Sequence, residues 1–247
     1  MIKKVSFFVL FTALSFAAFS QESTPATQKK TGRPNIPGTF SIDVGFNLPT
    51  EKNGFNTNPF GSRTLNIYYY YDLQIGNSNF SIHPGIGFGL ERYKFNNDKT
   101  LGYVSGPSID TLKMIPLTSV LPTASSFKKT QLITNYIDIP LEVRFSTNPD
   151  DPGRSFKVSL GFKFGVLYES FTKIKYREEG ETKKLEDKQN FNLNPIRYGP
   201  LFRIGFGPIS AYANYTLSPL FKDGEGPDGA KGSKINNFTV GLTLAAF

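Results

Sequence analysis

Cysteine and tryptophan are absent from this chain of 247 residues, and histidine occurs only once. The lack of cysteine excludes disulfide bonds, thiolate metal sites and a lipid-modified N-terminal cysteine. Beyond residue 20 the chain also has no run of about 20 apolar residues, which excludes a bundle of membrane-spanning helices. A membrane-spanning β-barrel stays compatible with the sequence, because its strands need only alternate between apolar and polar residues.

Basic residues outnumber acidic residues, 28 against 20, and give a net charge of +8. A positive balance of this size raises nucleic acid as a partner. The basic residues, however, form no long cluster interleaved with aromatic residues. We therefore expect no nucleic-acid partner.

The N-terminus has the features of an export signal. Lys3 and Lys4 precede an apolar run from Val5 to Phe19, and small residues lie at the positions that a signal peptidase reads. A retained membrane helix is the alternative, but the run is shorter than the roughly 20 residues that a span requires. We predict a signal peptide over 1–20, a polar periplasmic leader over 21–38 and a single β-barrel over 39–247.

Alternation of apolar and polar residues with a period of two dominates the rest of the chain. Between Phe40 and Leu48, for example, every second residue is large and apolar. This period is typical of strands with one apolar and one polar face. We expect eight strands, at residues 40–48, 65–75, 80–90, 136–145, 156–166, 196–206, 209–217 and 238–244.

The connections between these strands alternate strictly between long and short. Such sorting is typical of outer-membrane barrels, with short periplasmic turns and long extracellular loops, whereas a β-sandwich has no reason for it. The sequence thus predicts an all-β fold, an eight-stranded antiparallel up-and-down transmembrane β-barrel. The long links are 49–63, 96–134, 172–194 and 218–234, and the short ones are 76–79, 146–155 and 207–208.

The polar face of the expected strands carries charges of both signs in nearly equal number. Charges in a narrow lumen must pair, because an unpaired buried charge costs several kcal/mol. We therefore expect a lumen plugged by ion pairs, with Gly85, Gly87 and Gly89 leaving space for larger neighbours. A soluble lipocalin-like barrel, apolar inside and charged outside, is the alternative. The expected lumen charges are Asp43, Asp72, Glu91, Asp138, Glu142, Arg144, Lys157, Lys163, Glu169, Arg197 and Arg203.

The sequence offers little catalytic chemistry. His83 lies on the polar face, where it could act as the base of a lipid-acting enzyme, but no hydrolase motif or metal-spaced cluster accompanies it. We interpret it as a polar filler of the lumen. Asp138 and Glu142 share a face about 13 Å apart, at about 3.3 Å per residue, and are better matched to lumen bases than to each other. We expect no catalytic residue, no metal and no cofactor.

Two long loops are the better candidates for function. Residues 172–194 mix lysines with acids and suit lipopolysaccharide phosphates, a protein, or simply solvent. Residues 96–134 are too long for a bare connector. Their apolar cluster indicates packing against the barrel mouth or against a protein partner. The expected contact residues are Leu112, Met114, Ile115, Leu117, Val120 and Leu121.

The segment 129–142, which contains Asn135-Tyr136-Ile137-Asp138-Ile139-Pro140-Leu141, resembles a signature of the PorT-like outer-membrane β-barrel proteins of Bacteroidota. Segments 84–90 and 215–221 resemble two further strands of that family. The resemblance implies an integral outer-membrane protein. Members of the family include a component required for type IX secretion, so the resemblance also implies a role in a secretion or envelope complex.

We therefore expect a non-enzymatic outer-membrane barrel with a plugged lumen that acts as an interaction or structural component. Its expected partners are outer-membrane lipid, lipopolysaccharide and proteins of an envelope complex. Two alternatives stay open, a barrel enzyme that modifies envelope lipid and a small-solute channel. A catalytic constellation near His83 would favour the first, and ion conductance the second.

Overall fold

The computed structural model describes residues 38–50, 55–96, 98–106, 110–227 and 234–246. The expected signal peptide and nearly all of the expected leader lie outside these residues. Among the described residues, no helix combines the length and apolar character needed to cross a membrane.

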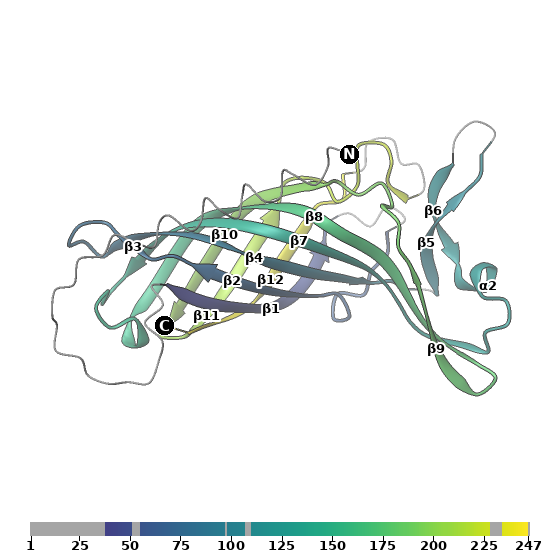
Figure 1. Ribbon diagram of the computed structural model, residues 1–247, viewed down its shortest axis with the longest axis horizontal. Helices are drawn as coiled ribbons and strands as arrows, with labels where there is room; N and C mark the ends of the chain where they lie inside the picture. Colours follow the sequence, from purple (N-terminus) through teal and green to yellow (C-terminus); the bar gives the residue numbers. More distant parts are fainter. Residues whose placement is uncertain (1–37, 51–54, 97, 107–109, 228–233, 247) are drawn as a thin grey trace, which may run out of the picture. The chain divides into compact units, whose positions relative to one another are not determined.

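Eight antiparallel strands close into a barrel, and each strand pairs with its neighbours along the chain (Figure 1). The last strand pairs with the first from Phe40 opposite Ala246 to Pro49 opposite Asn237, which closes the ring. The predicted fold class is thus confirmed. The barrel strands are β1 (Thr39–Pro49), β2 (Arg63–Tyr70), β4 (Phe80–Lys94), β7 (Ser126–Ser146), β8 (Phe156–Glu178), β10 (Ile196–Phe206), β11 (Ile209–Thr216) and β12 (Asn237–Ala246).

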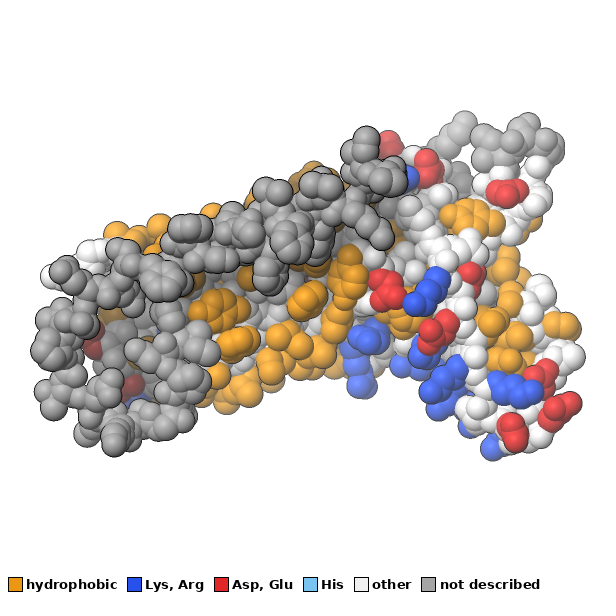
Figure 2. All heavy atoms as spheres, in the orientation of Figure 1, with side chains coloured by type: hydrophobic (Ala, Val, Ile, Leu, Met, Phe, Trp, Pro, Cys, Tyr) orange, Lys and Arg blue, Asp and Glu red, His pale blue; other side chains and the backbone are white. Residues whose placement is uncertain are grey.

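The strands place apolar residues outside and polar residues inside. In β1, Phe40 and Val44 are 51% and 56% exposed, whereas Ser41 and Asp43 are buried. On the part of the barrel face visible in Figure 2, the outward apolar residues form an orange band. We call this band the apolar belt. Its polarity is that of a membrane barrel and the opposite of a lipocalin-like carrier, which excludes the soluble alternative.

The two ends of the barrel differ. One end, here called the turn end, carries the short connections 76–79, 146–155 and 207–208, with the 3₁₀-helix η1 (Pro152–Arg154) in the second. The other end, the loop end, carries the long connections. At the turn end the strand expected over 65–75 is broken, because β2 ends at Tyr70 and a short strand, β3 (Leu73–Gln74), follows.

The long connections contain more regular structure than the sequence analysis expected. Strand β7 already begins at Ser126, and β5 (Lys99–Val104), β6 (Thr111–Pro116) and the short helix α2 (Leu117–Val120) fill much of the rest of 96–134. Strand β8 continues to Glu178 and pairs with β9 (Glu181–Asp187). Figure 1 shows β8 and β9 reaching past the other strands of the barrel at the loop end.

An apolar core sits at the loop end, formed by side chains from several connections. Phe55 contacts the rings of Tyr93, Phe95 and Phe221 at centroid distances of 5.4 to 5.9 Å. We call this core the apolar cap. It also contains Leu101, Leu112, Met114, Leu132, Phe191, Leu193, Leu220 and Ile235.

Candidate functional site

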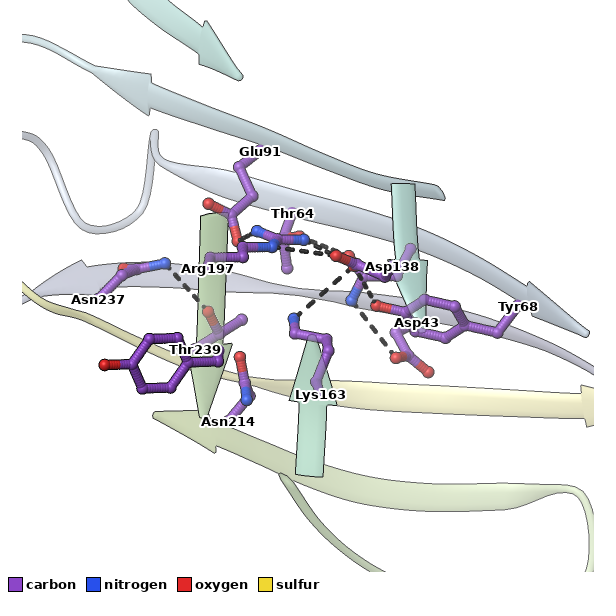
Figure 3. A network of polar contacts seen from close by, with 12 residues as sticks. Asp43, Thr64, Tyr68, Glu91, Asp138, Lys163, Arg197, Asn214, Asn237 and Thr239 are labelled. Atoms are coloured by element: carbon purple, nitrogen blue, oxygen red, sulfur yellow. Dashed lines mark hydrogen bonds and ion pairs between the residues drawn. The ribbon is translucent and has the colours of Figure 1, made fainter. Parts of the chain in front are cut away.

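The lumen holds an ion-pair cluster centred on Arg197 (Figure 3). Its guanidinium binds Asp138 through Nη2 to Oδ2 at 2.6 Å and through Nε to Oδ1 at 3.1 Å. Nη1 lies 2.5 Å from Oε1 of Glu91. Tyr68 donates a hydrogen bond to Asp138, and Lys163 lies 4.0 Å from the same carboxylate. Two acids and two bases thus balance each other in this Arg197 cluster.

A second cluster surrounds Arg203, six residues along the same strand. Arg203 binds both carboxylate oxygens of Asp43 at 2.7 and 2.9 Å, and its Nε lies 3.0 Å from Glu142. Tyr70 and Thr243 complete this Arg203 cluster. All these charged groups are buried, which requires the close pairing that the geometry provides.

Glycines make room for the Arg197 cluster. A methyl group added at Gly89 or Gly165 would overlap Arg197 and Asp138. Larger residues at these positions would therefore push the guanidinium and the carboxylate apart. The interpretation of Gly89 as space for a larger neighbour agrees with this packing.

Three further expected lumen residues, Lys157, Arg144 and Asp72, lie near the turn end. Lys157 donates to the carbonyl of Gly207 at 3.1 Å, and Arg144 donates to Ser159 at 3.2 Å. Asp72 is partly exposed there. Arg144 and Lys157 adjoin the Arg203 cluster, because they line the same small cavity.

Glu169 corrects the expected lumen set. It binds Asn135 at 2.9 Å and Lys188 at 3.1 Å, and its side chain is 36% exposed. The reason is a register shift between β7 and β8. Tyr136 pairs with Leu167, whereas its neighbour Asn135 pairs with Glu169. Tyr168 is therefore an extra residue in β8. A β-bulge of this kind reverses the facing of every residue that follows it.

Little space remains around the two clusters. The cavity beside Arg203 has a volume of about 20 Å³, and the cavity beside Arg197 about 10 Å³. A single water needs roughly 10–15 Å³. These cavities therefore have room for no more than about one water each.

The structure also corrects the expected partner-binding residues. Leu112 and Met114 belong to the apolar cap, and Leu117 is buried against Ile174 and Tyr176. Val120 and Leu121 pack against that smaller core, and Ile115 is half-buried. Two of the six residues, Leu112 and Met114, therefore pack at the barrel mouth, and Leu117, Val120 and Leu121 pack on the extended part of β8.

A groove of about 580 Å³ lies between the β5–β6 hairpin and the β8–β9 hairpin. Ile115 and Val120 line it, together with Leu185 of β9, which is 37% exposed. Acidic residues, Asp110 and Asp187, also line this groove. We call it the hairpin groove.

Two lysines of the β8–β9 hairpin form ion pairs with its acids. Lys173 lies 2.6 Å from Glu186, and Lys183 lies 2.9 Å from Glu178. Hydrogen bonds from Thr123 and Lys183 lower the pKa of Glu178, and the bond from Lys173 lowers the pKa of Glu186. The hydrogen bond to Glu178 raises the pKa of Lys183. This pairing engages Lys173 and Lys183.

A different basic cluster lies on the outer surface beyond the apolar belt. Arg63 is opposite Arg92 in the β2–β4 pairing. Lys94 is opposite Gln131 of β7, and Lys129 lies two residues before Gln131 on the same strand. Within the described residues, these four bases have no ion pair with an acid. Partial burial, and next the charges of Lys94, Arg63 and Arg92, lower the pKa of Lys129. Figure 2 shows blue side chains beside the orange belt, on the side toward β9. We call these four residues the basic rim.

The sequence analysis missed the surroundings of His83. The structure places Ser81 and Asp72 on either side of its ring, at hydrogen-bond distance from both ring nitrogens. The expected hairpin contained the signal. With Gly76–Asn79 as the turn, counting back along both strands places Asp72 opposite His83. Ser81 is two residues before His83 on the same strand and therefore lies on the same face.

The comparison with protein families agrees with this architecture. A family model described as an outer membrane protein β-barrel domain matches residues 12–222. No curated protein matches the chain. Among solved structures, the chain is similar to Ail, the attachment invasion locus protein of Yersinia pestis, solved in complex with the heparin analogue sucrose octasulfate. The identity is 15% over 85% of this chain and 100% of Ail, with a TM-score of 0.33. It is also similar to Neisserial surface protein A (NspA), at 11% identity over 85% of this chain and 97% of NspA, with a TM-score of 0.31.

Proposed function

This chain belongs to the family of outer membrane proteins with a β-barrel domain, and from this we propose that it is a plugged barrel that acts as an interaction or structural component of an envelope complex. The arginine clusters carry the first half of the proposal. Arg197 and Arg203 cross the lumen from β10 to reach β7, and Arg203 also reaches β1. The apolar cap covers the loop end above them.

Ion conductance tests the plug. Purified full-length protein in a planar bilayer is expected to give no stable current. The double variant Arg197→Ala with Asp138→Ala removes one of the two clusters, and it is also expected to give no stable current because the Arg203 cluster and the apolar cap remain. A stable current through the wild-type protein would contradict the plug and favour the small-solute channel.

We place the contact with a protein partner in the hairpin groove. Its apolar lining and its acidic residues, Asp110 and Asp187, fit an extended segment that carries apolar and basic side chains. The resemblance to the PorT-like proteins supports a partner in a secretion complex, of which type IX is the example.

Co-purification from native membranes tests this contact. Leu185→Arg puts a positive charge into the groove and is expected to abolish co-purification of the partner. Thr118→Arg, an exposed position on α2 outside the groove lining, is the matched control and is expected to retain the partner. An unchanged partner profile for Leu185→Arg would place the contact elsewhere.

A second contact, with lipopolysaccharide, is supported by the basic rim. These bases lie on the outer surface next to the apolar belt, the level at which lipid head groups surround a barrel. Arginine forks match phosphate oxygens in pairs, and a bound phosphate would relieve the repulsion among the four like charges. The partner proposed for the basic rim is thus the phosphate of lipopolysaccharide.

A further inference from the structure

Ser81, His83 and Asp72 form a continuous chain of side-chain hydrogen bonds at the turn end. Oγ of Ser81 lies 2.6 Å from Nε2 of His83, and Nδ1 of His83 lies 2.5 Å from Oδ1 of Asp72. Thr39 donates a further hydrogen bond, of 2.8 Å, to Oδ2 of Asp72. Three residues from one hairpin, of which Ser81 and His83 are buried, thus form the arrangement of a nucleophile, a base and an orienting acid.

The carboxylate determines the tautomer of the histidine. An ionised Asp72 can only accept hydrogen bonds, so Nδ1 of His83 carries the proton and donates it. In the neutral ring, Nε2 is then unprotonated and accepts the hydrogen bond from the Ser81 hydroxyl. This is the state in which a histidine can take the proton of a serine during nucleophilic attack.

Ser81 and His83 line a cavity of about 100 Å³ together with two basic residues, Arg144 and Lys157. Arg144 lies directly opposite Ser81 in the β4–β7 pairing. Its Nε donates to Ser159, which leaves its outer nitrogens with no hydrogen-bond partner among the described residues. Positive charge beside a serine nucleophile stabilises the oxyanion that forms during acyl transfer. It also favours a substrate that carries a negative charge.

We propose that this group is a serine-hydrolase site for short-chain carboxylic esters that bear an anionic group. Ser81 Oγ bonds to the ester carbonyl carbon while His83 takes the serine proton, and the Arg144 guanidinium binds the oxyanion. The C–O bond to the alcohol then breaks, and His83 returns the proton to the leaving alcohol. Water attacks the acyl-serine with His83 again as base, which releases the acid and restores Ser81. The net reaction consumes one ester and one water and yields one acid and one alcohol.

This activity is separate from the proposed role of the loop end. The hydrolase site lies among Asp72, Ser81 and Arg144 at the turn end, whereas the hairpin groove lies between β5–β6 and β8–β9. Loss of one would therefore leave the other intact.

Covalent labelling tests the proposal directly. Full-length folded protein in detergent is treated with a fluorophosphonate probe, which modifies nucleophilic serines, and the modified peptide is identified by mass spectrometry. Labelling is expected at Ser81 and is expected to slow about 100-fold in His83→Gln, the typical contribution of a general base. Ser78→Ala, on the exposed turn of the same hairpin, is the control and should label like the wild type. An unmodified Ser81 in the folded wild-type protein would overturn the proposal without any variant, and so would equal labelling of His83→Gln.

Substrate charge gives a second test. The wild-type protein is expected to hydrolyse mono-p-nitrophenyl succinate with a lower KM than p-nitrophenyl acetate. Lys157→Gln should raise the KM for the succinate ester about tenfold, a larger factor than for the acetate ester. Equal KM values for both esters in the wild-type protein would contradict the proposed preference for an anionic substrate. No release of nitrophenol from either ester above that of Ser81→Ala would overturn the activity itself.

Discussion

Nη1 of Arg203 lies 2.7 Å from Oδ1 of Asp43, although the two residues are 160 positions apart and their strands do not pair. The contact crosses the lumen, so it exists only when the barrel has closed. The same guanidinium binds Glu142, which makes one side chain responsible for two buried acids.

Removal of Arg203 should therefore destabilise the barrel strongly. Arg203→Met leaves Asp43 and Glu142 buried without their base, and we expect a loss of about 3–5 kcal/mol in the free energy of unfolding. Urea unfolding in lipid, followed by heat-modifiable migration, measures the change. Arg154→Met, an exposed position at the turn end, should stay within about 0.5 kcal/mol of the wild type. A similar loss in both variants would contradict the role given to Arg203.

The apolar belt predicts the cost of a charge on the lipid face. Ile139 is 55% exposed on the outer face of β7. Ile139→Arg should destabilise the inserted barrel by about 2–4 kcal/mol and reduce its assembly in the membrane. Ser119→Arg on α2 places the same charge outside the belt and should assemble normally. Normal assembly of Ile139→Arg would mean that this face does not meet lipid.

The basic rim predicts a preference for phosphorylated lipopolysaccharide. Wild-type protein should unfold at a higher temperature in lipopolysaccharide than in the same material after dephosphorylation. Combining Arg92→Ala with Lys129→Ala should remove most of that difference, whereas Lys113→Ala on β6 should not. High salt should also reduce the difference, because exposed charges are screened. A variant that keeps the full difference would exclude the basic rim as the phosphate site.

The Glu178 carboxylate makes the contact of the β8–β9 hairpin with the segment after α2 sensitive to acid. Its pKa is lowered by hydrogen bonds from Thr123 and Lys183, so the ionised form is the one that stabilises the contact. This stabilisation is complete above the usual pKa of glutamate and is lost as the pH falls through the lowered value. Amide hydrogen exchange near Ser125 should therefore accelerate in acid. In Glu178→Gln the exchange should be fast already at neutral pH, and a variant with wild-type exchange would refute the link.

The orientation of the barrel remains a prediction, and cysteine labelling tests it. Lys184→Cys, in the β8–β9 hairpin, should react with a membrane-impermeant reagent on intact cells. Asp151→Cys, at the turn end, should react only after the outer membrane is opened. The reverse pattern would place the loop end in the periplasm.

The alternation of apolar and polar residues with a period of two was sufficient to predict the fold and most of the residues that face the lumen. It places Asp43, Asp138 and Glu142 on one face, because alternation is preserved as long as a strand is regular. It failed at Glu169, because no residue type near Tyr168 marks the bulge in β8. The pairing of Arg203 with Asp43 was beyond sequence reasoning as well, since it depends on how the closed sheet curves.

The loop end was the hardest part to predict. An apolar loop residue can be buried in its own protein or exposed to a partner. The sequence around Leu112 and Leu117 would look the same in either case. Both are buried, Leu112 in the apolar cap and Leu117 against Ile174 and Tyr176 of β8. The relation of Asp72 to His83, by contrast, follows from the turn alone.

Strands β7 and β8 stay paired beyond the apolar belt, up to Ser126 opposite Arg177. Residues 169–178 of β8 follow the last apolar residues of the belt, and at about 3.3 Å per residue they add roughly 25–30 Å of height. Backbone hydrogen bonds between the strands make this extension stiff, unlike a flexible linker. The hairpin tip is therefore held at a fixed distance from the apolar belt, whichever side of the membrane the loop end faces.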